Sequence, residues 1–253
     1  MTAPQQPPKY VQQDQPDGVP PLELTGERTL PDVPEENYWF QRHLVVYEWI
    51  ARQTHGLKVI DMASGEGYGA DVIASRAREV VGVEANPDAF AHAVARYPRV
   101  RFERSLVETY AEPADAVSFL QTIEHVQNPD EVLENFKKSA PRAFVSTPNV
   151  KTLAPEGEER SGNPWHVFEY QLHEFRELCE RHYDEVEVLG LYHARKLLVH
   201  EQAIRVGWDW LHPKLRITKP FYAWFVPAMN VRDFVLRPAD ERALDFVAVC
   251  RNR

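Results

Sequence analysis

Apolar and polar positions along residues 58–193 follow two alternating periods. Short runs rich in Val, Ile and Phe, such as KVIDM, EVVGV and AVSFL, are typical of buried strands. Segments with apolar residues at helical spacing, such as PDAFAHAVARY and PDEVLENFKKS, lie between them. This alternation predicts an α/β fold built on a doubly wound parallel sheet. Ligands of such sheets bind beyond the carboxyl ends of the strands, so the residues that end each strand are the candidates for a site.

The two ends of this pattern differ in composition. Residues 1–21 are rich in Pro and Gln and nearly lack aliphatic side chains, which predicts a disordered tail. One domain is expected over residues 22–253, because a chain of 253 residues suits one large α/β domain with an accessory element. The segment EENYWFQRHLVVYEWIARQ predicts a helix before the first strand of the sheet.

The charge and the cysteine content limit which binding partners and which cellular compartment are expected. The formal net charge of −9 gives no general attraction to nucleic acids or to anionic membranes. Cys179 and Cys250 form no CxxC pair, and the sequence has neither a secretory signal pattern nor an apolar run near the ~20 residues of a membrane span. These features predict a reduced, cytoplasmic protein with neither a nucleic-acid nor a membrane partner.

The stretch VIDMASGEGYGADVI carries a glycine loop between an expected strand and an expected helix. Its GEGYGA core fits the G-x-G-x-x-G/A pattern of dinucleotide sites. A dinucleotide brings an anionic pyrophosphate to the helix N-terminus, whereas here Asp61 precedes the loop and Glu66 lies within it. Acidic residues suit a ligand with an ammonium and a sulfonium, such as S-adenosylmethionine (SAM). Glu84, at the next strand end, could accept hydrogen bonds from the ribose hydroxyls of either cofactor.

These ordered motifs resemble the class I SAM-dependent methyltransferases over roughly Leu22 to Tyr192, with Ala63 where glycine is commoner. The resemblance implies a seven-stranded Rossmann-like sheet whose last strand, ALDFVAVCR, is antiparallel, with SAM over the glycine loop. It implies adenine contacts near Ser105 and Leu106, a Gln121 contact to the methionine end, and a lid from the helix with Tyr38 and His43. For these last residues ordinary packing or surface polarity is the alternative. The implied cofactor-binding set is Tyr38, His43, Asp61, Ala63, Gly65, Gly67, Tyr68, Glu84, Ala85, Ser105, Leu106 and Gln121.

A second informative stretch, QTIEHVQNPDEVL, ends a strand with adjacent Glu124 and His125. A hydroxyl that accepts a methyl group holds its proton far above pH 7, so something must remove that proton. A histidine can act as general base, because its ordinary pKa is about 6.5. A bound Mg²⁺ or Mn²⁺ can instead stabilise the developing alkoxide. Both interpretations stay open.

The later segment NPWHVFEY places His166 in a loop before a helix. Together with Glu124 and His125 it resembles metal-dependent O-methyltransferases that combine an E-x-x-E-H motif with a distant histidine, including those acting on small RNA ends and quinone precursors. Gln121 stands where that motif has its first glutamate, which leaves Glu124, His125 and His166 as candidate metal ligands and catalytic residues. The alternatives are a strand-end pair that only shapes the pocket and an ordinary loop histidine.

Residues 192–242 form an insertion between the last two expected strands. It holds aromatic residues that could stack on sugar rings, form a small satellite core or make a homodimer surface; they are Trp208, Trp210, Phe221, Tyr222, Trp224 and Phe225. The sugar-stacking and dimer interpretations are compatible if the insertion of one subunit closes the pocket of another.

Four further stretches, GERTLP, NYWFQRHL, EHVQNPDEVL and STPN, are similar to bacterial methyltransferases of polysaccharide and glycoconjugate clusters, including mycobacterial methylmannose polysaccharide synthesis. The function expected from this resemblance is SAM-dependent O-methylation of a carbohydrate or a glycosylated metabolite, with a small-molecule or oligosaccharide acceptor. The alternatives are methylation of an RNA 3′ end and a SAM-binding partner protein without catalysis. The accepting hydroxyl and the oligomeric state stay open.

Overall fold

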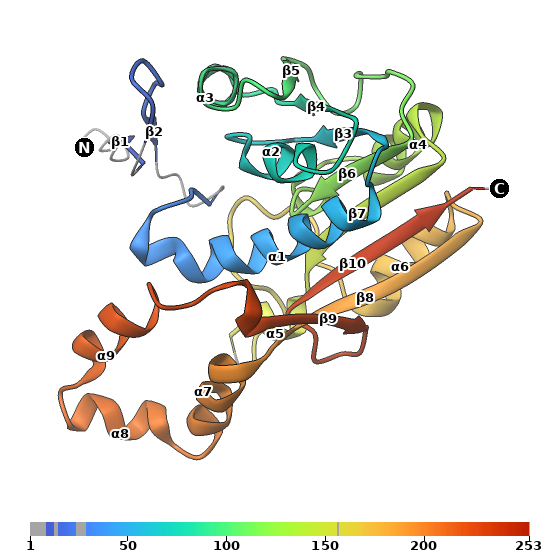
Figure 1. Ribbon diagram of the computed structural model, residues 1–253. Helices are drawn as coiled ribbons and strands as arrows, with labels where there is room; N and C mark the ends of the chain where they lie inside the picture. Colours follow the sequence, from blue (N-terminus) through green and yellow to red (C-terminus); the bar gives the residue numbers. More distant parts are fainter. Residues whose placement is uncertain (1–8, 13–14, 24–28, 156, 253) are drawn as a thin grey trace, which may run out of the picture.

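The computed structural model describes residues 9–12, 15–23, 29–155 and 157–252. Its main sheet has eight strands in the order β5-β4-β3-β6-β7-β10-β8-β9 (Figure 1). Strands β3 to β7 pair in parallel, whereas β10 is antiparallel to both β7 and β8. The α/β fold and its antiparallel last strand are therefore confirmed. The strands are β3 (Lys58–Met62), β4 (Glu79–Val83), β5 (Arg101–Glu103), β6 (Ala116–Leu120), β7 (Arg142–Pro148), β8 (Glu185–His193), β9 (Phe234–Pro238) and β10 (Asp245–Arg251).

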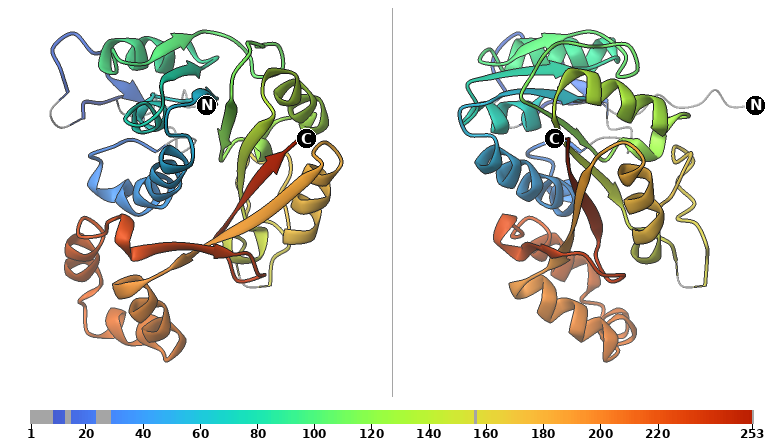
Figure 2. Two further views of the ribbon diagram at one scale, coloured as in Figure 1. Left: turned by 45° about the vertical axis from the view of Figure 1, so that its right-hand side comes forward. Right: turned by 90° about the vertical axis from the view of Figure 1, so that its right-hand side faces the viewer.

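Helices cover both faces of this sheet (Figure 2). On one face, apolar side chains of α4 and α6 pack on alternate residues of the central strands, such as Phe119 and Phe246. On the other face, α1, α2 and α3 pack on the intervening residues, such as Phe144 and Val247. All five residues of β6 are buried, because helices cover both of its faces. The helices are α1 (Asn37–Gln53), α2 (Tyr68–Ala74), α3 (Pro87–Arg96), α4 (Pro129–Ser139), α5 (Val150–Leu153) and α6 (Leu172–Glu180).

The insertion adds three helices and an edge strand that the expected seven-stranded sheet lacks. Helices α7 (Arg195–Arg205), α8 (Trp208–Lys214) and α9 (Thr218–Phe225) precede a short 3₁₀ turn and β9. Strand β9 pairs antiparallel with β8, from Leu189 opposite Pro238 to His193 opposite Phe234. The chain must return from the insertion to β10, and its last segment satisfies the otherwise unpaired edge of β8. Among the residues that the structure describes, none of the helices has the length and hydrophobicity needed to span a bilayer.

Part of the expected disordered tail is ordered. Strand β1 (Lys9–Tyr10) pairs antiparallel with β2 (Leu22–Glu23), and the buried amide of Gln12 donates to Glu66 at 3.2 Å. Leu22 packs with Leu30 and Val33 in a small apolar cluster. These contacts with the domain offset the conformational entropy that the tail loses on ordering, which its own few apolar side chains could not do. The prediction of disorder is therefore wrong for residues 9–12 and 15–21. Residues 1–8 and 13–14 lie outside the described part of the chain.

A buried ion pair joins α1 to the sheet. Arg42 Nε donates to Asp245 Oδ2 at 2.6 Å, and its Nη2 donates to Asp245 Oδ1 at 2.5 Å and to the Leu244 carbonyl at 2.7 Å. The two side chains are 4% and 1% exposed. The forked guanidinium thus matches the carboxylate with two parallel hydrogen bonds. It fixes the register of α1 against the start of β10.

We predict that Asp245→Ala lowers the free energy of unfolding by about 3–5 kcal/mol, because it leaves the Arg42 charge buried without a partner. The double variant Arg42→Met with Asp245→Leu should lose less free energy of unfolding than Asp245→Ala loses, because the double variant removes both charges. Urea denaturation followed by circular dichroism measures both. The exposed pair of Arg52 with Glu48, 3.9 Å apart, is the control, and Glu48→Ala should change stability by less than about 1 kcal/mol. A loss no larger for Asp245→Ala than for this control would contradict the prediction.

Candidate active site

The loop after β3 adopts a backbone that requires small residues. Ala63, Gly65 and Gly67 have positive φ angles of 55°, 58° and 100°. A Cβ atom on Gly67 would lie 2.8 Å from Cζ of Phe102, so only glycine fits there. The loop then enters α2 at Tyr68. The glycine spacing in the sequence therefore reflects a left-handed turn that brings backbone N–H groups to the carboxyl edge of the sheet.

Glu84 holds this loop from the end of β4. Its carboxylate accepts hydrogen bonds from the N–H groups of Gly65 and Asn86, each at 2.8 Å. Asp61, buried in β3, accepts from the Ser118 hydroxyl at 2.6 Å through Oδ1. Burial raises the pKa of Asp61 to about 7, an effect that the Ser118 hydrogen bond opposes and the nearby Glu84 charge increases. Two carboxyl groups thus lie beneath the loop in different electrostatic settings.

Most of the Glu66 side chain is buried among hydrogen-bond donors, although Glu66 also borders the cavity over the glycine loop. Its carboxylate accepts from the Tyr97 hydroxyl and from the amide of Gln12, each at 3.2 Å, and from the Tyr68 N–H at 3.1 Å. His92 Nε2 lies 3.3 Å from Glu66 Oε2, and the Glu66 side chain is 1% exposed. These donors compensate the Glu66 charge on the inner side of the loop. Glu66 therefore anchors the N-terminal segment from the edge of this cavity, and its effect on a ligand stays a prediction.

Two neighbouring cavities open at this edge of the sheet. The first, of about 100 Å³, lies over the glycine loop and is lined by Ala63, Gly65 and Tyr68 among others. The second, of about 580 Å³, is lined by Trp39, Glu124, His125 and His166 among others. Thr29, His43 and Gln121 line both cavities. A ligand in the first cavity would therefore adjoin one in the second.

The expected cofactor residues divide into two groups. Lining the first cavity or holding its loop are His43, Asp61, Ala63, Gly65, Gly67, Tyr68, Glu84 and Gln121. Tyr38 lies elsewhere, because its hydroxyl is 2.9 Å from His193 Nε2 and its ring packs on Phe234. Ala85, Ser105 and Leu106 follow β4 and β5 on the same sheet edge but line neither of these two cavities. Tyr38 and His43 are five positions apart on α1, which at about 100° per residue points them about 140° apart around the helix.

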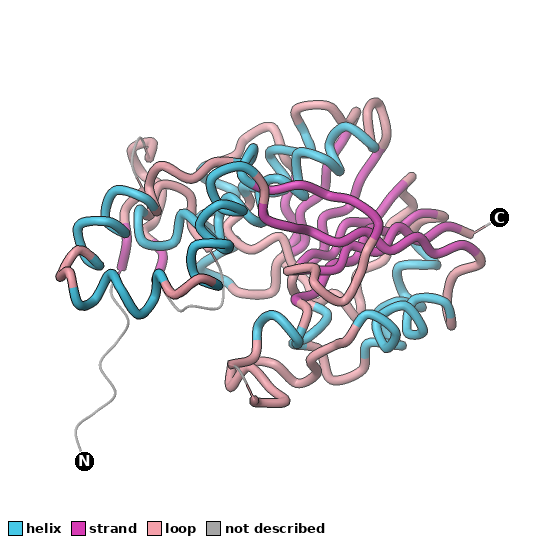
Figure 3. The backbone as a smooth tube through the Cα atoms, turned by 90° about the horizontal axis from the view of Figure 1, so that it is seen from below, coloured by secondary structure: helices cyan, strands magenta, loops and turns pink. Residues whose placement is uncertain are grey.

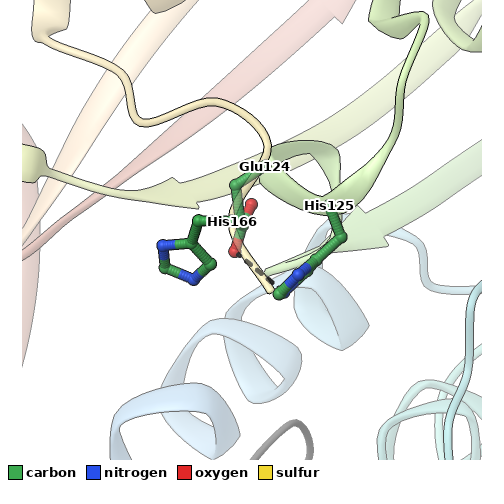
Figure 4. Close-up of side chains that lie close together, drawn as sticks. All are labelled: Glu124, His125 and His166. Atoms are coloured by element: carbon green, nitrogen blue, oxygen red, sulfur yellow. Dashed lines mark ion pairs between the residues drawn. The ribbon is translucent and has the colours of Figure 1, made fainter. Parts of the chain in front are cut away.

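Glu124, His125 and His166 do come together (Figure 4). The 3₁₀ turn Ile123–His125 carries the first two. The loop with His166 is pinned to that turn, because the Glu124 carbonyl accepts from the N–H groups of Val167 at 2.8 Å and Phe168 at 3.1 Å. One carboxylate oxygen and one nitrogen from each imidazole all lie within 4.8 Å of one another. The sequence prediction that these three residues meet is therefore supported by the geometry.

Hydrogen bonds fix how each histidine presents its ring. His125 Nδ1 lies 2.9 Å from the Trp165 carbonyl, which can only accept, so Nδ1 carries the proton and Nε2 keeps its lone pair in the neutral ring. His166 Nδ1 lies 2.8 Å from Glu169 Oε1 and Nε2 lies 3.1 Å from the Asn163 amide nitrogen. The first contact again assigns the proton to Nδ1. His125 Nε2 can therefore act as a base or as a metal ligand, whereas His166 Nε2 accepts a hydrogen bond from the Asn163 amide and could take either role only after that amide moves.

The Glu124 carboxyl group is a buried member of the cluster, as is the His166 side chain. Its Oε2 accepts no hydrogen bond from the described residues. Burial, with smaller contributions from the Asp245 and Glu169 charges, raises the pKa of Glu124 to about 8. A cation would compensate this carboxylate, and a carboxylate with two imidazoles is a common set of transition-metal ligands. Ligand atoms about 2.1 Å from a metal lie at most about 4.2 Å apart, so the cluster would need only a small side-chain adjustment.

Comparison with known proteins identifies the family. A family model described as a methyltransferase domain matches residues 37–195. A "Probable S-adenosylmethionine-dependent methyltransferase" of Mycolicibacterium smegmatis is 38% identical over 245 residues, covering 90% of this chain and 94% of that protein. One of Mycobacterium tuberculosis with the same description is 38% identical over 183 residues, covering 70% of this chain and 66% of that protein. The chain belongs to the SAM-dependent methyltransferase family.

Solved methyltransferases share the fold. A SAM-dependent methyltransferase of Thermotoga maritima superposes with a TM-score of 0.59 at 14% identity, covering 87% of this chain and 95% of that one. Magnesium protoporphyrin IX methyltransferase of Synechocystis, with bound S-adenosylhomocysteine, gives a TM-score of 0.52 at 17% identity, covering 66% of this chain and 84% of that one. At these identities the likeness concerns the fold alone.

Several residues of this methyltransferase site escaped the sequence analysis. Trp39 was assigned only to the packing of a helix, although it lines the larger cavity. Glu169 orients His166 from three positions further along, a spacing that could have been noticed. Thr29 lines both cavities, and the sequence analysis noted its stretch GERTLP without assigning Thr29 to the site. Ser118 could not be paired with Asp61 before the strand register was known.

We predict that Asp61 lowers the stability of the ligand-free methyltransferase as pH rises. The pKa of Asp61 is raised in the folded protein. Its contribution to the free energy of unfolding is therefore fully present below about pH 4 and is lost as pH rises through about 7. Over this pH range the free energy of unfolding of wild type should fall by about 4 kcal/mol relative to that of Asp61→Asn. Urea denaturation at several pH values measures the difference, with the exposed Asp88→Asn as control. A pH-independent difference between wild type and Asp61→Asn would refute the assignment.

Proposed function

We propose that this methyltransferase transfers a methyl group from SAM to a hydroxyl group of a carbohydrate or glycosylated metabolite. The observation that carries the proposal is the position of Glu124, His125 and His166 in a cavity that adjoins the glycine-loop cavity. SAM supplies an electrophilic methyl group, and a sugar hydroxyl needs help in losing its proton. The side chains of Glu124, His125 and His166 could help to remove this proton, and they line the larger cavity, where the acceptor would bind.

SAM would occupy the glycine-loop cavity. A carboxylate has about four lone-pair sites, so Glu84 can hold Gly65 and Asn86 and still accept from ribose hydroxyls. Ala85, Ser105 and Leu106 would border the adenine from the neighbouring strand ends. Burial lowers the pKa of His43 to about 4, a net effect that the Asp245 charge opposes and the Arg42 charge supports. A neutral His43 beside Gln121 adds no positive charge near the sulfonium.

The transfer itself requires one proton to leave. The acceptor oxygen bonds to the methyl carbon as the carbon–sulfur bond breaks, and the sulfonium becomes a neutral thioether. His125 Nε2 or His166 Nε2 would accept the hydroxyl proton. If Glu124, His125 and His166 bind Mg²⁺ or Mn²⁺, the metal would supply Lewis-acid stabilisation of the alkoxide. Two imidazoles make this donor set softer than the oxygen ligands that Mg²⁺ prefers, which favours Mn²⁺ of the two.

The larger cavity suits a sugar. Trp39 offers an aromatic face, and Glu35, Ser161 and Asn163 offer polar groups that can bond to hydroxyls. Glu35 and Glu36 add negative charge at its wall, which opposes a phosphate backbone and so disfavours an RNA 3′ end. No residue of the insertion lines either of the two cavities, so the aromatic insertion does not contribute sugar stacking within one described subunit. A homodimer in which a partner's insertion reaches the cleft remains compatible with this proposal.

The cofactor prediction concerns Glu84. Wild type should bind SAM and S-adenosylhomocysteine and should not bind NAD or NADP measurably. Glu84→Ala should weaken SAM binding, because each hydrogen bond to a charged group contributes about 1.5–3 kcal/mol. Isothermal titration calorimetry measures these affinities, with Glu103→Ala at the end of β5 as the control. An unchanged dissociation constant for Glu84→Ala would remove Glu84 from the cofactor site.

The catalytic prediction concerns the two histidines. His125→Ala and His166→Ala should each reduce the turnover of labelled SAM on short oligosaccharides by about 10²–10⁴-fold, while SAM affinity changes little. The exposed His55→Ala is the control and should retain wild-type turnover. Loss of activity with a chelator and recovery with Mn²⁺ or Mg²⁺ would support the metal interpretation, and full activity with the chelator would support a histidine base. Near-normal turnover in both histidine variants would refute the site.

A further inference from the structure

The aromatic residues of the insertion divide into an inner and an outer set. Trp208, Phe221, Tyr222 and Phe225 pack against one another and against His200 and His212. This inner set holds α7, α8 and α9 together and is continuous with the core cluster on the α1 face of the sheet. Trp210 and Trp224 form the outer set, with exposed fractions of 65% and 68%. Trp224 touches the inner set only through Phe225, and Trp210 has no ring contact with it among the described residues.

Other apolar side chains of the three helices also face solvent. They include Val199 and Val206, which are 70% and 86% exposed, and the full exposed set is Leu198, Val199, Ile204, Val206, Trp210, Leu211, Leu215, Ile217 and Trp224. On α7, the turn of about 100° per residue places Val199 on the side opposite the buried Leu197, with Leu198 and Arg205 about a quarter turn from Leu197. Concentrated exposed apolar surface on one element indicates an interaction surface.

The insertion is basic although the chain is acidic. Residues 195–225 contain six Lys and Arg and two Asp and Glu, a net charge of +4. The whole chain carries −9, so the remainder carries −13. The exposed cations lie among the exposed apolar residues; they are Arg195, Arg205, Lys214, Arg216 and Lys219. Lys214 Nζ lies 3.4 Å from the centre of the Trp210 ring, so charge and aromatic surface occur side by side.

The three helices lie at one end of the molecule, where Leu197 and Phe225 reach into the core cluster shared with α1 and the sheet. Figures 1 and 3 show them as short segments joined by tight turns at one end of the molecule. They contact the first turn of α1, where the Asn37 amide donates to the Val226 carbonyl at 2.8 Å and to the Met229 carbonyl at 3.0 Å. Their outer surface is therefore available to a large, flat partner without rearrangement of the domain.

We propose that the outer surface of α7–α9 docks on an anionic lipid bilayer. Short helices with Trp and aliphatic residues among Lys and Arg match the chemistry of interfacial helices, whose apolar side chains enter the headgroup region while cations remain at the lipid phosphates. An isologous dimer through this surface would place two patches of charge +4 against each other, which is unfavourable. Charge complementarity thus selects an anionic bilayer over a second copy. The expectation of no membrane partner rested on the average charge of the chain and is revised by this proposal.

Vesicle binding by the full-length chain tests this docking. Co-sedimentation should show binding to vesicles of phosphatidylcholine mixed with phosphatidylglycerol, weaker binding as salt rises, and little binding to phosphatidylcholine alone. Trp210→Ala with Trp224→Ala should lower the partition coefficient at least about tenfold, whereas phenylalanine at both positions should preserve most binding. Lys214→Glu with Lys219→Glu should also lower it at least about tenfold.

The matched control is Lys137→Glu with Lys138→Glu, which makes the same charge change at exposed positions of α4. It should retain binding, and thermal melts should show that all variants are folded. Equal loss in this control, equal binding to neutral vesicles, or no binding by wild type would overturn the proposal. A dimer in size-exclusion chromatography that Trp210→Ala with Trp224→Ala converts to monomer would assign the surface to a second copy instead. None of these readouts depends on methyl transfer, so they are independent of the proposed acceptor.

Discussion

The buried pairing of Arg42 with Asp245 sets the geometry of three parts of the molecule. It holds α1 at the point where the sheet changes from parallel to antiparallel, between β7 and β8. From that position α1 directs Asn37 and Tyr38 to the insertion and β8, and Trp39 and His43 to the cavities. Because a buried pair gains little net stability over apolar residues, its main contribution is placement. Its Asp245 charge also adds to the forces that keep the pKa of Glu124 high.

The three acidic residues around the glycine loop show how burial divides similar side chains among different tasks. Glu84 makes two backbone hydrogen bonds that shape the loop, and Asp61 lies in an apolar strand with one hydroxyl donor. Glu66 joins the loop to Gln12 and His92 on the inner side. From sequence position alone, Asp61 and Glu66 were both expected to act as negative charges near the ligand. Which of them affects a ligand depends on orientation, and orientation depends on donors contributed by distant segments.

The sequence predicted those features whose cause is local. Strand periodicity, glycines at positive φ and polar residues at strand ends all follow from neighbouring residues, and they located the glycine loop, Glu84 and the Glu124–His125 pair. The N-terminal strands and β9 were missed because each forms only by pairing with a segment elsewhere in the chain. Tyr38 was misplaced for the same reason, since its partners His193 and Phe234 lie in later strands. His166 was assigned through resemblance, and the carbonyl of Glu124 supplies the physical reason for its position.

Averages over the whole chain hide the property that distinguishes the insertion. A net charge of −9 describes the long-range field, but salt screens exposed charges beyond about 8–10 Å, so a partner in contact responds to local charge. The insertion has the opposite sign to the remainder, and its aromatic residues are only partly used for packing. The first turn of α1 contacts the insertion through Asn37 and the larger cavity through Trp39. The first turn of α1 therefore links the insertion to the wall of the larger cavity, although the insertion itself lines neither cavity.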